Sequence, residues 1–222
     1  LTRKFSAKFS NKTGFTYTKM YYDMDMNLAP HLMQPLELIS EGKGNTDLIS
    51  AYTSSSIGLS DQVTLNVGIN VQVLTLNNSW VLEPRAGVKW QASPKSSFAL
   101  AYGLHSRMEK MDVYFVKTQG TGDRSVNKDL DFTKAHHVML SYGFKVSDNM
   151  NVKIEPYFQY LYDVPVIADS SYSVLNRRDF YVEDALVNRG KGRNIGIDLT
   201  LERYLNKGLY YMVTASIFNS RY

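Results

Sequence analysis

Three motifs in the sequence contain residue types that could bind a metal ion or a nucleotide. Asp23, Asp25 and Asn27 alternate as at the start of an EF-hand calcium loop. That loop also needs glycine at its sixth position and glutamate at its twelfth, where this chain has Leu28 and Gln34. The stretch is therefore interpreted as polar residues at the edge of a loop. The glycines of the stretch 190–196 have the wrong spacing for a dinucleotide-binding loop.

The histidines form no obvious metal site either. His136 and His137 are adjacent, so on a strand they point to opposite faces and cannot hold one ion together. His105 lies near Glu109 and could be a ligand, but a solvated base in a loop is the favoured interpretation. No serine–histidine–acid arrangement and no pair of carboxylates with a defined geometry is recognisable. The sequence thus predicts no enzyme, no cofactor and no metal.

Composition narrows the class of protein. The 222 residues include no cysteine, which excludes disulfides and thiolate ligands. The net charge is +4, and the basic residues are spread along the chain, so no nucleic-acid partner is predicted. No apolar run is long enough for a transmembrane helix, which leaves strands as the only way to cross a bilayer. The 16 tyrosines suit positions that are apolar on one side and wet on the other, although soluble β-proteins are also rich in aromatics.

Strict alternation of apolar and polar residues is the main structural signal. The clearest case runs from Val63 to Val73, and two more runs flank a turn at Asn206–Gly208. Because successive side chains on a strand point to opposite faces, each run predicts a strand with one apolar and one polar face. Strands are predicted at residues 1–10, 15–26, 47–59, 62–73, 85–91, 97–105, 138–146, 152–162, 194–202 and 209–217.

The connections between these strands differ in length. Short turns are predicted near Lys12, Asp61, Lys95, Asn149 and Lys207, and long loops at 27–46, 108–133 and 163–191; the connection near Asn78 is also short. Transmembrane barrels have short periplasmic turns at one end and longer extracellular loops at the other. This asymmetry favours an antiparallel meander of about ten transmembrane strands. It disfavours a soluble β-sandwich with a binding role, which is kept as an alternative.

Charged residues occur in the middle of the polar faces of these strands. A water-filled barrel tolerates charges on its inner side while lipid covers the apolar side. The residues predicted to form the interior wall of the barrel are Lys89, Lys153, Glu155, Asp198 and Glu202. Asp198 and Glu202 are expected to pair with inward-facing Lys or Arg on neighbouring strands.

Several stretches resemble one family of membrane proteins. Residues 190–204 read GKGRNIGIDLTLERY and residues 82–90 read LEPRAGVKW; the stretches 101–106, 207–211 and 216–222 match as well. Together they are similar to TonB-dependent outer-membrane receptors of the Bacteroidetes type. The resemblance extends through most of the chain, but it does not indicate which cargo is bound.

The resemblance implies a barrel of about twenty-two strands around an N-terminal plug, in the bacterial outer membrane. The implied partners are the lipid bilayer, the protein's own plug, TonB, and a small cargo or a partner lipoprotein. Residues 1–222 are expected to be a single barrel segment without a plug, a fragment that begins at Leu1 with no signal-peptide pattern. The alternative is a complete small, non-transporting barrel or surface binding protein that ends at the aromatic Tyr222.

Two groups of cations are the candidates for contact with a ligand. Arg177 and Arg178 form one group, and Lys191 and Arg193 the other, both assigned to the predicted loop 169–193. If this loop is extracellular, it belongs to the mouth that captures cargo. The cations could meet an anionic ligand or a lipopolysaccharide phosphate, or they could be solvated loop charges.

Overall fold

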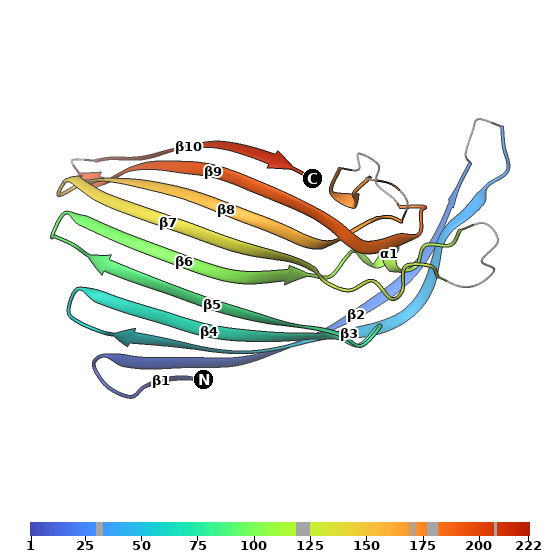
Figure 1. Cartoon of the computed structure of the whole chain (residues 1–222), viewed down its shortest axis with the longest axis horizontal. Helices are drawn as coiled ribbons and strands as arrows, with labels where there is room; N and C mark the ends of the chain where they lie inside the picture. Colours follow the sequence, from blue (N-terminus) through green and yellow to red (C-terminus); the bar gives the residue numbers. More distant parts are fainter. Residues whose placement is uncertain (30–32, 119–124, 169, 171, 177–181, 207) are drawn as a thin grey trace.

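The computed structural model describes residues 1–29, 33–118, 125–168, 170, 172–176, 182–206 and 208–222. These residues form one antiparallel sheet of ten strands in the order of the sequence (Figure 1). The strands are β1 (Thr2–Lys4), β2 (Phe9–Leu28), β3 (Glu37–Gly58), β4 (Val63–Leu74), β5 (Ser79–Gln91), β6 (Ser96–Arg107), β7 (Thr133–Ser147), β8 (Met150–Ile167), β9 (Leu186–Asn206) and β10 (Leu209–Arg221). The predicted all-β meander of ten strands is confirmed. The continuous sheet does not fit the β-sandwich alternative, which requires two packed sheets.

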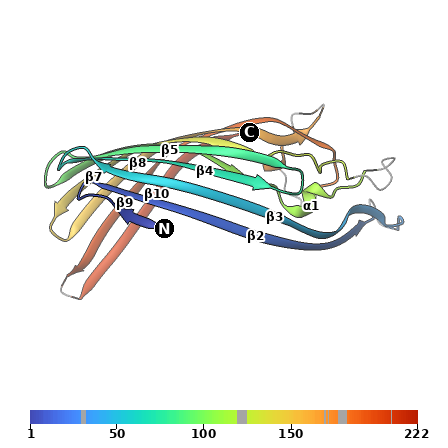
Figure 2. The ribbon, with the colours of Figure 1, turned by 90° about the horizontal axis from the view of Figure 1, so that it is seen from below.

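In the part of the chain that the structure describes, helical structure is limited to two short pieces, α1 (Met111–Tyr114) and the 3-10 helix η1 (Val174–Asn176). No helix in the described part of the chain has the length and apolarity needed to cross a bilayer. Within the described residues, β1 and β10 pair only with β2 and β9, so the sheet is open along both of its outer strands. Figure 2 shows that the sheet curves like a trough.

The predicted difference between the two ends of the sheet is present. The tight turns gather at one end, which we call the short-turn end, and the longer connections gather at the other, the long-loop end (Figure 1). The connection 108–132 agrees with the sequence prediction. The loops predicted at 27–46 and 163–191 are too long, because β3 already begins at Glu37, and β8 and β9 extend to Ile167 and from Leu186.

The predicted turn near Lys12 is wrong, since Asn11 to Gly14 lie within β2 and the first turn occupies residues 5–8. The Asn11 side chain donates hydrogen bonds to Thr53 Oγ1 at 2.9 Å and Ser55 Oγ at 3.0 Å on β3. Gly14 lies opposite Tyr52, whose ring occupies the space where a Cβ atom of residue 14 would be. Contacts with the neighbouring strand thus outweigh the local turn propensity.

The apolar face of the sheet carries aromatic residues near both ends. Near the short-turn end, the rings of Trp90, Phe98 and Tyr142 stack in sequence, with centroids 5.7 and 4.8 Å apart. Near the long-loop end of β5, Trp80 is 63% exposed. Ten residues separate Trp80 from Trp90, which is about 33 Å along a strand and about 25 Å across a bilayer for a strand tilted by ~40°. That height matches the apolar band of membrane barrels.

The compact core of the molecule lies at the long-loop end. The connection 108–132 contributes most of its fully buried side chains, among them Tyr114, Val116 and Phe132, which pack with Leu74 and Val81 of the sheet. Val116 also bridges to Ser40 of β3, and Figure 2 shows α1 beside the long-loop ends of β3 and β4. Long loops in this chain are therefore partly held by apolar burial.

Three asparagines tie this connection to its neighbours through backbone groups. Asn77 donates to the carbonyl oxygens of residues 128 and 130 at 3.1 and 2.7 Å. Asn127 donates to the carbonyl of residue 184 at 2.9 Å and accepts from the Leu186 N–H at 2.8 Å. Asn188 donates to the carbonyls of residues 131 and 163 at 3.3 and 2.8 Å. Three separate connections thus form one cross-linked layer.

The buried phenol of Tyr114 makes this layer sensitive to alkali. Burial raises the pKa of Tyr114 to about 12, whereas an unfolded tyrosine titrates near 10. The stabilising contribution of the neutral phenol is therefore complete below pH 10 and is lost as the pH rises from 10 through 12. We expect the protease resistance of residues 108–118 to fall over this pH window. In Tyr114→Phe residue 114 cannot ionise, so we expect the protease resistance of residues 108–118 to stay unchanged over the same pH window.

Candidate functional site

The register of the strands sorts the charged residues onto the polar face of the sheet. Cross-strand partners share a face, and Glu83, Arg85 and Lys89 of β5 lie opposite Asn70, Gly68 and Thr64 of β4. The neighbouring residues on each strand are apolar and form the other face. The polar face is also the one on which Leu74 meets the buried connection 108–132. A ligand that moves along the polar side of this wall would meet these residues.

Glu83 occupies a gap between two strands. Pairing of β5 with β6 ends at Arg85 and Gly103, so β5 and β6 separate beyond that point. The Glu83 carboxylate is only 1% exposed and accepts hydrogen bonds from the Ser106 N–H and Oγ, each at 2.7 Å. Asn70, Gln72 and Arg85 donate to it at 2.9, 3.0 and 2.8 Å. Glu83 therefore connects β4, β5 and β6 at the level where β5 and β6 no longer pair through their backbones.

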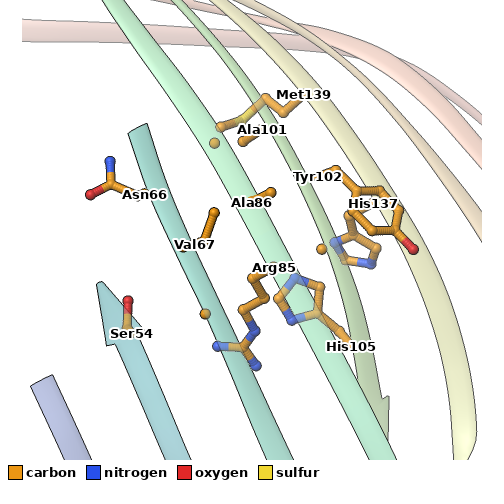
Figure 3. Close-up of a pocket in the computed structure, with 13 residues that line it drawn as sticks. Ser54, Asn66, Val67, Arg85, Ala86, Ala101, Tyr102, His105, His137 and Met139 are labelled. Atoms are coloured by element: carbon orange, nitrogen blue, oxygen red, sulfur yellow. The ribbon is translucent and has the colours of Figure 1, made fainter. Parts of the chain in front are cut away.

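Arg85 borders a hollow of about 430 Å³, and Figure 3 shows its side chain beside His105. One nitrogen of its guanidinium is fixed by Glu83, and the side chain is half exposed toward the hollow. His105 and His137, from β6 and β7, face each other with ring centroids 4.6 Å apart on the same side. An anchored guanidinium beside two imidazoles can donate hydrogen bonds to an anionic or polar group of a ligand.

Small residues make room for this hollow. Gly68, Gly87 and Gly103, from three adjacent strands, line it. At Gly103 a Cβ atom would lie 2.7 Å from His105 Nε2, so the ring occupies the space that a side chain at 103 would need. The present position of the His105 ring therefore depends on glycine at position 103.

The predicted wall residues lie nearer the short-turn end, on the same face. Lys89, Lys153 and Glu155 line a second hollow of about 650 Å³, and Lys153 Nζ is 2.8 Å from Glu155 Oε1. Asp198 and Glu202 lie opposite Glu155 and Asn151. Within the described residues neither Asp198 nor Glu202 forms an ion pair, so the expected pairing with inward Lys or Arg is wrong. Asp198 faces another carboxylate instead.

The predicted loop cations are placed only in part. Arg177 and Arg178 lie outside the described residues. Lys191 and Arg193 are in strand β9 and not in a loop, because β9 begins at Leu186. Arg193 is opposite Tyr160 of β8, on the apolar face of the sheet.

The hollow at Arg85 was not predicted from the sequence, and the structure places His105 differently from the prediction. His136 and His137 point to opposite faces, as predicted. His136 bonds the Tyr102 hydroxyl at 2.9 Å, while His137 faces His105. His105 is not a loop base, because β6 continues to Arg107. Glu109 is bonded instead to Thr133, with 2.7 Å between Thr133 Oγ1 and Glu109 Oε1. A signal was available in the alternation of β6, which puts residue 105 on the face of Ala101 and Gly103.

Comparison with known proteins identifies the fold. No family model matches the chain, and no curated protein sequence matches it. The siderophore receptor PirA from Pseudomonas aeruginosa superposes with a TM-score of 0.69 at 11% identity, over 98% of this chain and 38% of that one. The FrpB iron transporter from Neisseria meningitidis superposes with a TM-score of 0.67 at 15% identity, over 99% of this chain and 34% of that one. The copper transporter OprC superposes with a TM-score of 0.61 at 9% identity, over 96% of this chain and 36% of that one. The chain thus has the fold of a stretch of these transporters and spans about a third of their length.

Proposed function

We propose that this chain is a segment of the β-barrel wall of a TonB-dependent outer-membrane receptor, of the Bacteroidetes type, that imports a nutrient or a metal chelate. The observation that carries the proposal is the fold, which coincides over nearly the whole chain with siderophore, iron and copper transporters. The motifs at residues 82–90 and 190–204, which resemble this family, also support the proposal. The partners of such a receptor are the bilayer, a plug domain, TonB and the cargo or a lipoprotein that delivers it.

The two faces of the sheet support this function. The apolar face, with aromatic residues about 25 Å apart across the bilayer, suits contact with lipid. The polar face, with Lys89, Lys153, Glu155, Asp198 and Glu202, suits a water-filled interior. On this assignment the short turns are periplasmic and the layer around Tyr114 is extracellular. Arg85, His105 and His137 then lie on the path between the mouth and the plug.

The proposal is tested by uptake in cells that express the complete protein. We expect deletion of its gene to lower the accumulation of one radiolabelled chelate from a panel of iron siderophores and copper complexes. Loss of TonB should lower it to the same level, and complementation should restore it. Protein found in the outer membrane with unchanged uptake in every case would instead support the non-transporting barrel.

A pair of variants links the uptake to the polar face. Arg85→Gln keeps a group that can bond Glu83 but removes the charge at the hollow, so we expect severalfold lower uptake at unchanged protein level. Arg203→Gln is the matched control. Arg203 lies on the apolar face near the short-turn end, opposite Tyr211, and its variant should transport normally. Equal uptake by the two variants would mean that the hollow at Arg85 does not lie on the transport path.

A further inference from the structure

Four polar residues interrupt the apolar face of the sheet. Two belong to β2 and two to β3, and they are Asn11, Thr13, Thr53 and Ser55. Asn11 lies opposite Ser55, and Thr53 lies between Thr13 of β2 and Ile69 of β4. Because cross-strand partners share a face and Ile69 belongs to the apolar one, the four side chains point to the lipid side of the proposed barrel wall. We call these four residues the polar cluster.

The polar cluster lies well inside the apolar band. Charged residues mark both ends of this stretch of β2, since Lys8 pairs with Asp61 at the short-turn end and Lys19 lies opposite Asp47 toward the long loops. From residue 8 to residue 19 a strand covers about 36 Å, which is ~28 Å across a bilayer at a tilt of ~40°. The middle of the cluster is about 10 Å in depth from Lys8 on the same scale. In a bilayer its surroundings would be hydrocarbon.

The hydrogen bonds inside the polar cluster leave part of its bonding capacity unused. The Asn11 amide nitrogen donates to Thr53 Oγ1 and Ser55 Oγ at 2.9 and 3.0 Å. Thr13 Oγ1 donates to Asn11 Oδ1 at 2.9 Å, and the two threonine hydroxyls are 3.1 Å apart. Within the described residues Ser55 Oγ accepts a bond but has no acceptor for its own hydrogen. Hydrocarbon cannot bond these groups, so burial in lipid alone is costly.

The open outer surface of the polar cluster does not result from a missing neighbour in the sheet. Strand β1 pairs alongside β2, so that Arg3 lies directly beside Asn11, and Leu1 exchanges backbone hydrogen bonds with Thr13. The Arg3 guanidinium lies over the ring of Phe5, 4.9 Å from its centroid. Both threonines of the cluster are nevertheless exposed. A cover for the cluster must therefore come from a second molecule that packs face to face with the sheet.

The polar cluster is complementary to a second copy of itself. It has no charge, so it offers no counter-charge to a headgroup or to an acidic or basic segment. It has a donor in the Ser55 hydroxyl and an acceptor in the second lone pair of Asn11 Oδ1. In a pair related by a two-fold axis, Ser55 of each copy can donate to Asn11 of the other. Serine and threonine are also small, which lets two backbones approach closely, as at packed interfaces within membranes.

We propose that two copies of the complete protein pair within the membrane through the polar cluster. The exposed rings of Phe9 and Phe15, which flank the cluster along β2, form the apolar rim of the contact. The pairing rests on the proposed function, because it needs this face of the sheet in a bilayer. It is independent of the cargo and of whether the protein transports anything.

Cysteine cross-linking in outer-membrane vesicles tests the contact. The 222 residues contain no cysteine, and any cysteine elsewhere in the complete protein is first replaced by serine. With a short bismaleimide, we expect Thr53→Cys to give a covalent dimer of twice the protomer mass. Leu140→Cys is the matched control, because Leu140 is 47% exposed on the same face of β7. It should give at least about tenfold less dimer.

A pair of double variants tests the role of the polar groups. Asn11→Ala/Ser55→Ala should weaken self-association about tenfold in sedimentation equilibrium of the complete protein in detergent, since each copy loses its donor and its acceptor. Ser56→Ala/Asn66→Ala is the matched control. Ser56 and Asn66 lie opposite each other on the polar face of β3 and β4, so their loss should leave self-association unchanged.

Three outcomes would overturn the pairing. They are equal cross-linking of Thr53→Cys and Leu140→Cys, a Thr53→Cys product whose mass is not twice that of the protomer, and unchanged self-association in Asn11→Ala/Ser55→Ala. Failure of the unmodified protein to reach the outer membrane would contradict the proposed function and the pairing together, whereas the three outcomes above contradict the pairing alone.

Discussion

Replacing Glu83 by alanine is expected to lower the free energy of unfolding by about 3 kcal/mol. The substitution removes the acceptor for Ser106, Asn70, Gln72 and Arg85 in a place where water does not reach the carboxylate. Buried donors that lose their acceptor are costly, and here β5 and β6 have no backbone pairing to replace it. Urea unfolding of the complete protein in detergent, followed by gel mobility and tryptophan fluorescence, measures the change.

Glu155→Ala is the matched control for this prediction. Glu155 also faces the polar side and also has one basic partner, Lys153, at 2.8 Å. The Lys153 side chain is 46% exposed, so the pair is expected to contribute less than about 1 kcal/mol. Equal losses in the two variants would mean that the Glu83 network contributes no more than a solvated ion pair.

Tyr114→Ala is expected to open the connection 108–132, with a loss of about 4 kcal/mol in the local stability of this layer. The Tyr114 side chain is fully buried among apolar residues, and truncation leaves a cavity. Tyr114→Phe removes only the hydroxyl, which accepts a bond from the Glu109 N–H at 3.2 Å, and should cost about 1 kcal/mol.

Limited proteolysis at residues 108–118, with the strands as internal reference, separates these two variants. We expect rapid cleavage there in Tyr114→Ala and near-normal resistance in Tyr114→Phe. The strands should remain resistant in both, because their backbone hydrogen bonds do not involve Tyr114. If the two variants are cleaved at the same rate, the ring is not what holds the connection in place.

The alternating pattern was sufficient to predict ten strands and their order, because each strand pairs only with its neighbours in the sequence. Local turn signals were less reliable. Asn11–Gly14 and Gly42 have turn-forming residues, yet both lie in strands, where contacts with Tyr52 and Phe115 use the space that glycine leaves. Such contacts come from residues about thirty-eight and seventy-three positions away, so a local window cannot detect them.

The candidate site was predictable from the alternating pattern only in part. The faces of Lys89, Lys153 and Glu155 follow from alternation alone, and the structure places all three at one hollow. The roles of Glu83 and Arg85 depend on the point at which β5 and β6 stop pairing, which is a property of two strands and not of either sequence. Among the described residues Asp198 has no cationic partner, and this depends in the same way on the register across β8 and β9.

The asparagine bonds at the long-loop end have a consequence for how this surface can evolve. Asn77, Asn127 and Asn188 bond backbone groups of residues 128, 130, 131, 163, 184 and 186. These bonds do not involve the side chains at those six positions. Lys128 is exposed, and its charge can change while the bond to its carbonyl persists, whereas Asp131 and Asp163 also pair with Lys134. An exposed residue of this kind can therefore vary under selection without loss of the bonds that hold the layer together.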